Sequence, residues 1–217
     1  MRRLIRDLAL SASVAIVVVT SNASSANEPS SAPDPAYALN GRPLLDALRK
    51  GGYTLYFRHT STDFSKLDGA MSNYSDCANQ RMLAEKGRDE ARLIGKAIAE
   101  LKIPVGEVLA SPYCRTMETG TLMFGRATGA NEIREEAGNN YAALKQLLAK
   151  SVAASAGNRM IAGHGTPFRA IAGPPHLSEG EAVVLKSIES RHVVVARITI
   201  GDWTALVDAA KKVEARR

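Results

Sequence analysis

The chain has 217 residues and a formal net charge of +6, from 28 basic and 22 acidic side chains. The basic side chains form no continuous block and aromatic residues make up only 5% of the chain, which argues against nucleic-acid binding. This modest positive charge suits a small anionic substrate, and the length allows one domain with a full hydrophobic core.

The first 26 residues have the pattern of a signal peptide. Arg2, Arg3 and Arg6 form a basic start, residues 8–19 form an apolar run, and residues 24–26 are the small residues that a signal peptidase recognises. The apolar run is shorter than the ~20 residues that span a bilayer, and an uncleaved anchor is the alternative.

We therefore expect a signal peptide over residues 1–26, a flexible lead-in over 27–39 and a single domain over 40–217. The expected location is the periplasm or the outside of the cell. No membrane attachment is expected after cleavage, and the sequence does not indicate an oligomeric state.

Hydrophobic periodicity and turn residues predict helices that alternate with strands. The expected helices cover residues 40–50, 83–101, 141–154 and 202 to the end, and the segment 111–119 is expected to form a turn with Pro112 and then the start of a further helix. The expected strands cover 53–57, 105–110, 159–162, 181–188 and 192–200. Residues 60–80 form a polar loop that is too long to be a mere connection. This order argues for an α/β sandwich with a largely parallel sheet.

Functional side chains follow three of these strands. Arg58 and His59 end the first strand, Arg115 comes just after the second, and His164 follows the third between two glycines. In an open α/β sheet the carboxyl ends of the strands border the ligand crevice. We therefore expect the two histidines and two arginines to converge at one edge of the sheet.

This combination of side chains suits phosphoryl transfer. Guanidinium groups bind a dianionic phosphoryl group, one imidazole attacks phosphorus, and the other stabilises the charge on the phosphoryl oxygens. His59 is the expected nucleophile, and Thr62 in the following loop is a further candidate for phosphate binding. The other histidines, His176 in a loop and His192 at the start of its strand, are expected to be structural or surface residues.

At this point the chain resembles the histidine phosphatase superfamily, in particular its phosphoglycerate-mutase-like branch. Arg58-His59 is similar to the Arg-His-Gly nucleophile motif, the segment Ser111–Thr119 is similar to the second motif, and Gly163-His164 is similar to the second histidine. The resemblance covers residues 53–200. It implies a three-layer α/β/α sandwich with a mostly parallel central sheet, and catalysis through a phosphohistidine without a cofactor or a metal.

The sequence departs from the family pattern at three positions, one of which is Gly120 in place of the small alanine that often follows the threonine of the second motif. Thr60 replaces the usual glycine after the nucleophile, and its side chain is expected to narrow the loop. Gly165 stands where the acid-phosphatase branch carries an aspartic acid, so that branch is disfavoured. The proton donor is then expected elsewhere, with Glu136 favoured over Glu135, and Asp63 third.

Cys77 and Cys114 are the only cysteines, and export would place them in an oxidising compartment. We expect them to form one disulfide, with two buried free thiols as the alternative. They lack the spacing and the histidine partners of a zinc site.

The expected function is an exported, small, single-domain phosphatase that acts on a small phosphorylated substrate. A phosphomutase is the alternative among enzymes, although the signal peptide argues against it because the glycolytic mutases of the family are cytoplasmic. A phosphate-ligand binding protein with degenerate catalysis is the alternative outside enzymes, because Thr60 departs from the family motif and the proton donor is unassigned.

Overall fold

The computed structural model describes residues 39–135 and 140–215. The expected signal peptide, nearly all of the expected lead-in and Glu136 lie outside the described residues. No helix in the described part of the chain is both long enough and apolar enough to span a membrane.

The described residues contain one mixed sheet with the strand order β3-β2-β4-β1-β5-β6. The strands are β1 (Thr54–Arg58), β2 (Val105–Ala110), β3 (Thr128–Gly129), β4 (Asn158–Gly163), β5 (Ala182–Ile188) and β6 (Arg191–Ile198). From β3 to β1 the neighbours are parallel, whereas β5 pairs antiparallel with β1 and β6. The predicted mostly parallel sheet is therefore confirmed, with an antiparallel hairpin at one side.

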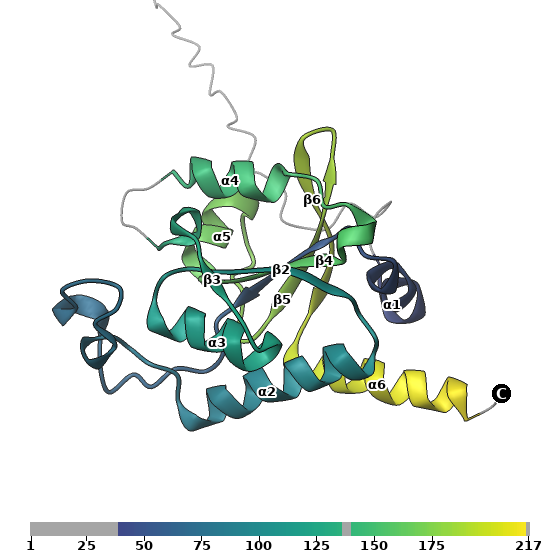
Figure 1. The fold of residues 1–217 in the computed structure, drawn as a ribbon, viewed down its shortest axis with the longest axis horizontal. Coiled ribbons are helices and arrows are strands. Elements are labelled where there is room, and N and C mark those ends of the chain that lie inside the picture. The colour runs from purple at the N-terminus through teal and green to yellow at the C-terminus, as the bar shows by residue number, and fades with distance from the viewer. Residues whose placement is uncertain (1–38, 136–139, 216–217) are drawn as a thin grey trace, which may run out of the picture.

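Helices cover both faces of this sheet, which confirms the three-layer arrangement. Within the described residues they are α1 (Gly41–Lys50), α2 (Glu85–Glu100), α3 (Cys114–Phe124), α4 (Ala142–Ala149), α5 (Gly165–Ala172) and α6 (Ile200–Glu214). In the view of Figure 1, α4 and α5 lie above the sheet, and α2, α3 and α6 lie below it.

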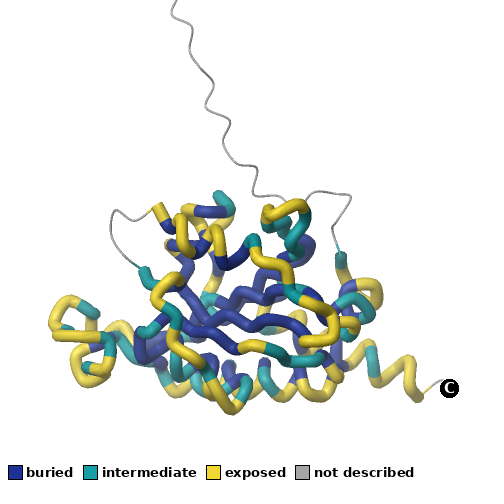
Figure 2. Tube along the Cα trace, turned by 45° about the horizontal axis from the view of Figure 1, so that its top comes forward, coloured by how far each residue is buried: buried dark blue, intermediate teal, exposed yellow. Residues whose placement is uncertain are grey.

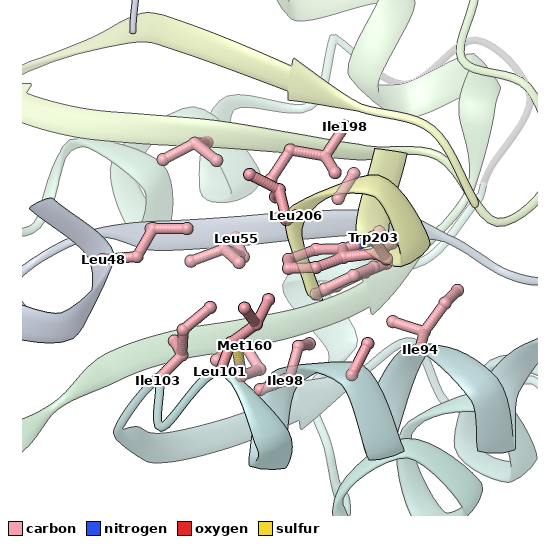
Figure 3. Close-up of a cluster of buried hydrophobic side chains, with 14 of the residues drawn as sticks. Leu48, Leu55, Ile94, Ile98, Leu101, Ile103, Met160, Ile198, Trp203 and Leu206 are labelled. Carbon is pink, nitrogen blue, oxygen red and sulfur yellow. The ribbon is translucent and has the colours of Figure 1, made fainter. Parts of the chain in front are cut away.

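The alternation of side chains along β1 divides the core between the two faces. Leu55 and Phe57 pack into the cluster formed with α1, α2, α3 and α6, whereas Tyr56 belongs to the cluster under α4 and α5. Phe57 stacks on Trp203 of α6 with ring centroids 6.3 Å apart. Figure 3 shows this first cluster, and Figure 2 shows the buried strands between more exposed helices.

Helix α2 packs unusually closely because of two glycines on its buried side. A Cβ atom on Gly95 would overlap the backbone carbonyl of Met123, and one on Gly87 would overlap that of Ser61. Glycine inside a helix costs about 1 kcal/mol relative to alanine. Close packing of α2 against α3 and against the chain that follows β1 explains why it is tolerated here.

The strand order places the functional residues together. Strands β2, β4 and β1 are parallel neighbours, so the residues after their carboxyl ends, Ser111, His164 and His59, reach one edge of the sheet. Strand β5 runs in the opposite direction, so the segment that precedes it arrives at the same edge. The same register places His192 opposite Ser187, at the other end of the sheet from His59.

Candidate active site

His59 is buried at the carboxyl end of β1 in one defined orientation. Its Nδ1 lies 3.0 Å from the carbonyl oxygen of Thr60, and because a carbonyl only accepts, Nδ1 carries the hydrogen and donates it. In the neutral ring Nε2 then holds the lone pair. The predicted nucleophile therefore presents an unprotonated nitrogen, as attack on phosphorus requires.

The surroundings of His59 keep its ring neutral. Burial lowers its pKa to about 3, against the hydrogen bond to Thr60, and the positive charges of Arg115, Arg58 and Arg81 lower it further. The pKa of His164 also lies well below its ordinary value, first because the ring is buried and then because Arg115 is near. Both histidine rings are therefore neutral in the folded chain.

His164 faces His59, with ring centroids 5.7 Å apart. Its backbone is held by Tyr56, whose hydroxyl accepts from the amide of His164 at 3.0 Å and donates to the carbonyl at 2.9 Å. The Nε2 atom lies 2.8 Å from the hydroxyl oxygen of Ser111. Its Nδ1 atom lies 3.5 Å from Nη2 of Arg115 and is thereby turned toward the cationic part of the site.

Three guanidinium groups surround the histidines: the predicted Arg58 and Arg115, and Arg81, which the sequence analysis missed. Each has a buried Nε without a hydrogen-bond partner among the described residues. Each also lowers the pKa of both histidines through its charge. A buried donor without a partner is costly, and an oxyanion in the site would supply acceptors for donors of this kind.

Arg115 is fully buried and firmly held. Its Nη1 donates to Asp68 at 2.9 Å, its guanidinium carbon lies 4.5 Å from the ring centre of Tyr113, and Nη2 lies 3.8 Å from Glu135. Burial lowers its pKa, although Asp68 opposes that effect. The same oxygen of Asp68 accepts from the backbone amide of Arg81 at 2.9 Å. Asp68 therefore joins the loop of Arg81 to the side chain of Arg115.

A disulfide between Cys77 and Cys114 reinforces this connection, with the Cα atoms 5.7 Å apart. The amide of Cys114 also donates to the side chain of Gln80 at 2.9 Å. The segment between β1 and α2, which projects at the left of Figure 1, is thus tied to the start of α3. Arg81 follows Gln80 in this segment, and Arg115 follows Cys114 at the start of α3, so both arginines are adjacent to residues that link the two segments.

The candidate proton donors fall into three different places. Glu135 is close to the site: its Oε2 lies 3.5 Å from Nδ1 of His164 and 3.8 Å from Arg115. Glu136, the favoured candidate, lies outside the described residues. Asp63 is fully exposed and accepts from the amide of Ser65 at 2.9 Å, a bond that lowers its pKa. This is the wrong direction for a proton donor, so the expectation for Asp63 is corrected.

Thr62 does not fit its expected role in phosphate binding. Its hydroxyl donates to Oε1 of Glu179 at 2.8 Å and its amide donates to Oε2 at 3.3 Å, so both donors already have an anionic partner. Glu179 also lies 3.5 Å from Nη2 of Arg58. The sequence analysis missed Glu179 because only the antiparallel course of β5 brings its loop to this edge.

Thr60 does not narrow the site as expected. Its side chain is buried, and its hydroxyl lies 3.5 Å from that of Thr119 on α3. Its amide lies 3.4 Å from the same hydroxyl. The extra side chain relative to the family motif therefore packs against α3.

Solved structures of other proteins share this α/β architecture. No family model matches the chain, and no curated protein matches it. The structure of the protein histidine phosphatase SixA complexed with tungstate is similar at a TM-score of 0.50 and 17% identity, covering 69% of this chain and 98% of that one. Phosphoserine phosphatase from Entamoeba histolytica, a mutant in complex with phosphoserine, is similar at 0.50 and 11% identity, covering 69% and 98%. The chain therefore has the α/β fold of these phosphatases.

Proposed function

We propose that the chain is a member of the histidine phosphatase superfamily, in its phosphoglycerate-mutase-like branch, and hydrolyses a small phosphate monoester through a phosphohistidine. One observation carries the proposal: His59 presents an unprotonated Nε2 beside His164, among three guanidinium groups whose buried Nε atoms have no partner in the described part of the chain. A tetrahedral dianion complements this set of groups in charge and in hydrogen bonding.

In this mechanism Nε2 of His59 attacks phosphorus while Arg58, Arg81 and Arg115 bind the phosphoryl oxygens. The carbonyl of Thr60 orients the ring and stabilises the positive charge that it gains. His164, fixed by Ser111, faces the phosphoryl group with Nδ1. Water then attacks the phosphohistidine, and inorganic phosphate leaves.

Turnover of para-nitrophenyl phosphate by the mature protein tests this activity. His59→Asn is the sharpest variant, because an amide nitrogen can still donate to Thr60 while no nucleophile remains. We expect a loss of several orders of magnitude. His192→Asn, at the opposite end of the sheet, should leave the rate unchanged. Binding of phosphate without turnover by the wild type would favour a binding protein, and transfer to a second hydroxyl would favour a phosphomutase.

We further propose that the protein acts in the periplasm or outside the cell after loss of residues 1–26. The basic start and apolar run of that segment support this, as does the disulfide between Cys77 and Cys114. Cell fractionation followed by mass measurement of the protein under non-reducing conditions tests it. Recovery of the full-length chain in the cytoplasm with two alkylatable thiols would contradict it.

A further inference from the structure

His176, which the sequence analysis treated as a structural or surface residue, lies against the active site. Its ring covers Gly165, the residue next to His164, so closely that a Cβ atom on Gly165 would overlap the ring. His176 itself is exposed, whereas Gly165 and His164 are buried. The imidazole therefore occupies the space that a side chain at position 165 would take, at the boundary between the buried site and solvent.

The orientation of His176 is fixed through the carbonyl oxygen of Leu177. Its Nδ1 lies 2.9 Å from that oxygen and must donate to it, since a carbonyl only accepts. The same oxygen accepts from Nη1 of Arg58 at 2.8 Å. Arg197 of β6 holds the backbone from the other side, donating to the carbonyls of Pro175 and His176 at 3.1 and 3.4 Å. His176 and Arg58 thus donate to the same carbonyl oxygen, and Nε2 of His176 has no partner among the described residues.

The geometry of in-line phosphoryl transfer suggests a role for Nε2 of His176. In-line attack by Nε2 of His59 expels the leaving oxygen on the opposite side of phosphorus. Because His59 is buried and the ester enters from solvent, we expect that oxygen to face solvent. His176 is an exposed imidazole that packs on Gly165, the neighbour of His164, and shares the carbonyl of Leu177 with Arg58. We propose that His176 is the proton donor to the leaving group, an assignment that rests on the proposed phosphatase activity and completes it.

The step balances with His176 entering as the imidazolium, its extra proton taken from solvent. The bond between Nε2 of His59 and phosphorus forms as the bond between phosphorus and the ester oxygen breaks. The ester oxygen takes the proton from Nε2 of His176 and leaves as an alcohol. In the second half, neutral His176 removes a proton from the attacking water, the nitrogen–phosphorus bond breaks, and phosphate departs.

Glu135 is the alternative donor among the described residues, and its contacts suggest a different task. Its carboxylate lies 3.5 Å from Nδ1 of His164 and 3.8 Å from Nη2 of Arg115, so it already serves as the partner of two groups that face the phosphoryl group. We infer that Glu135 positions these groups. Glu135→Gln is therefore the comparison variant for the test of His176.

The experiment compares an alkyl phosphate with para-nitrophenyl phosphate, whose leaving group departs without a proton. His176→Asn is the decisive variant, because its amide can still donate to Leu177 and so keeps the anchor while removing the titratable nitrogen. A positioned acid contributes about 10²–10⁴-fold. We expect His176→Asn to slow the alkyl ester by about that factor and the nitrophenyl ester by less than about tenfold. His192→Asn, far from the site, should change neither rate.

Three results would overturn the assignment. If His176→Asn lowered the hydrolysis rates of both esters equally, His176 would be a structural or binding residue. The proposed phosphatase activity would not be affected by that result. A split between the esters in Glu135→Gln but not in His176→Asn would move the acid to Glu135. A wild-type protein that hydrolyses neither ester would remove the phosphatase activity, and the role of His176 with it.

Discussion

The buried Nε atoms of Arg58, Arg81 and Arg115 are the residue-level feature from which we infer affinity for an oxyanion. A buried Nε–H without an acceptor among the described residues is unfavourable, as is the closeness of three guanidinium groups, and burial lowers the pKa of both Arg58 and Arg115. A bound phosphate would accept hydrogen bonds from these Nε–H groups and would reduce the repulsion between the three positive charges. Arg81 gives the most informative test of this inference, because it lies in the irregular loop between β1 and α2.

Arg81→Lys should weaken the binding of phosphate or vanadate, since lysine keeps the charge but loses the planar fork. A lost hydrogen bond to a charged group costs about 1.5–3 kcal/mol, which corresponds to a rise of about tenfold or more in the inhibition constant. The matched control is Arg92→Lys on the exposed side of α2, where the side chain pairs with Asp89. Identical inhibition constants for the two variants would exclude Arg81 from the site.

At the scale of elements, the sequence predicted most of the helices and strands and the meeting of His59 with His164, because both histidines end apolar strands. It missed α5, whose first turn contains both Gly165 and Pro167, residues that are unusual inside a helix. It also missed the two-residue strand β3. Arg81 and Glu179 could not be predicted, since their positions depend on a disulfide-tied loop and on strand order. Neither feature leaves a periodic pattern in the sequence.

The close packing of α2 gives a test at this scale. Gly95→Ala should lower the free energy of unfolding, although alanine is the better helix former, because the new Cβ would overlap the carbonyl of Met123. Gly201→Ala in the first turn of α6 is the control, since its Cβ would meet only the hydroxyl of Thr199 at 3.9 Å. Chemical denaturation measures both. Equal stabilisation by the two substitutions would contradict the packing that we describe for α2.

The disulfide gives a second test, because few side chains of the segment between β1 and α2 are buried. Replacing Cys77 and Cys114 with serine should cost about 2–4 kcal/mol of unfolding free energy and also weaken phosphate binding, since Arg81 lies in the freed segment. Wild-type protein treated with a reductant should behave in the same way. A double variant with unchanged stability and unchanged phosphate affinity would show that Asp68 and Gln80 alone position the loop.

For the whole molecule, the two buried neutral histidines make stability depend on pH. The pKa of His59 is about 3 in the folded chain and near 6.5 when unfolded, so between these values only the unfolded chain binds the proton. Stability therefore falls as the pH falls below about 6.5, by up to about 1.4 kcal/mol per pH unit for this group. His164 acts in the same direction.

Unfolding by urea between pH 7 and pH 5, in buffers without phosphate, measures this dependence. His59→Asn should show a shallower loss of stability toward pH 5 than the wild type, because one of the two groups has been removed. Superimposable pH dependences would mean that folding does not lower the pKa of His59. That result would contradict the buried, neutral state that we describe for its ring.

The phosphorylated intermediate tests the central claim most directly. The mature protein is mixed with a phosphate ester, quenched within its first turnover in alkali, where a phosphohistidine survives, and digested for mass spectrometry. We predict a phosphoryl group on His59 in the wild type and none in His59→Asn. A protein that turns over the ester with its phosphoryl group on another residue, or with no phosphorylated residue at any time, would contradict the account.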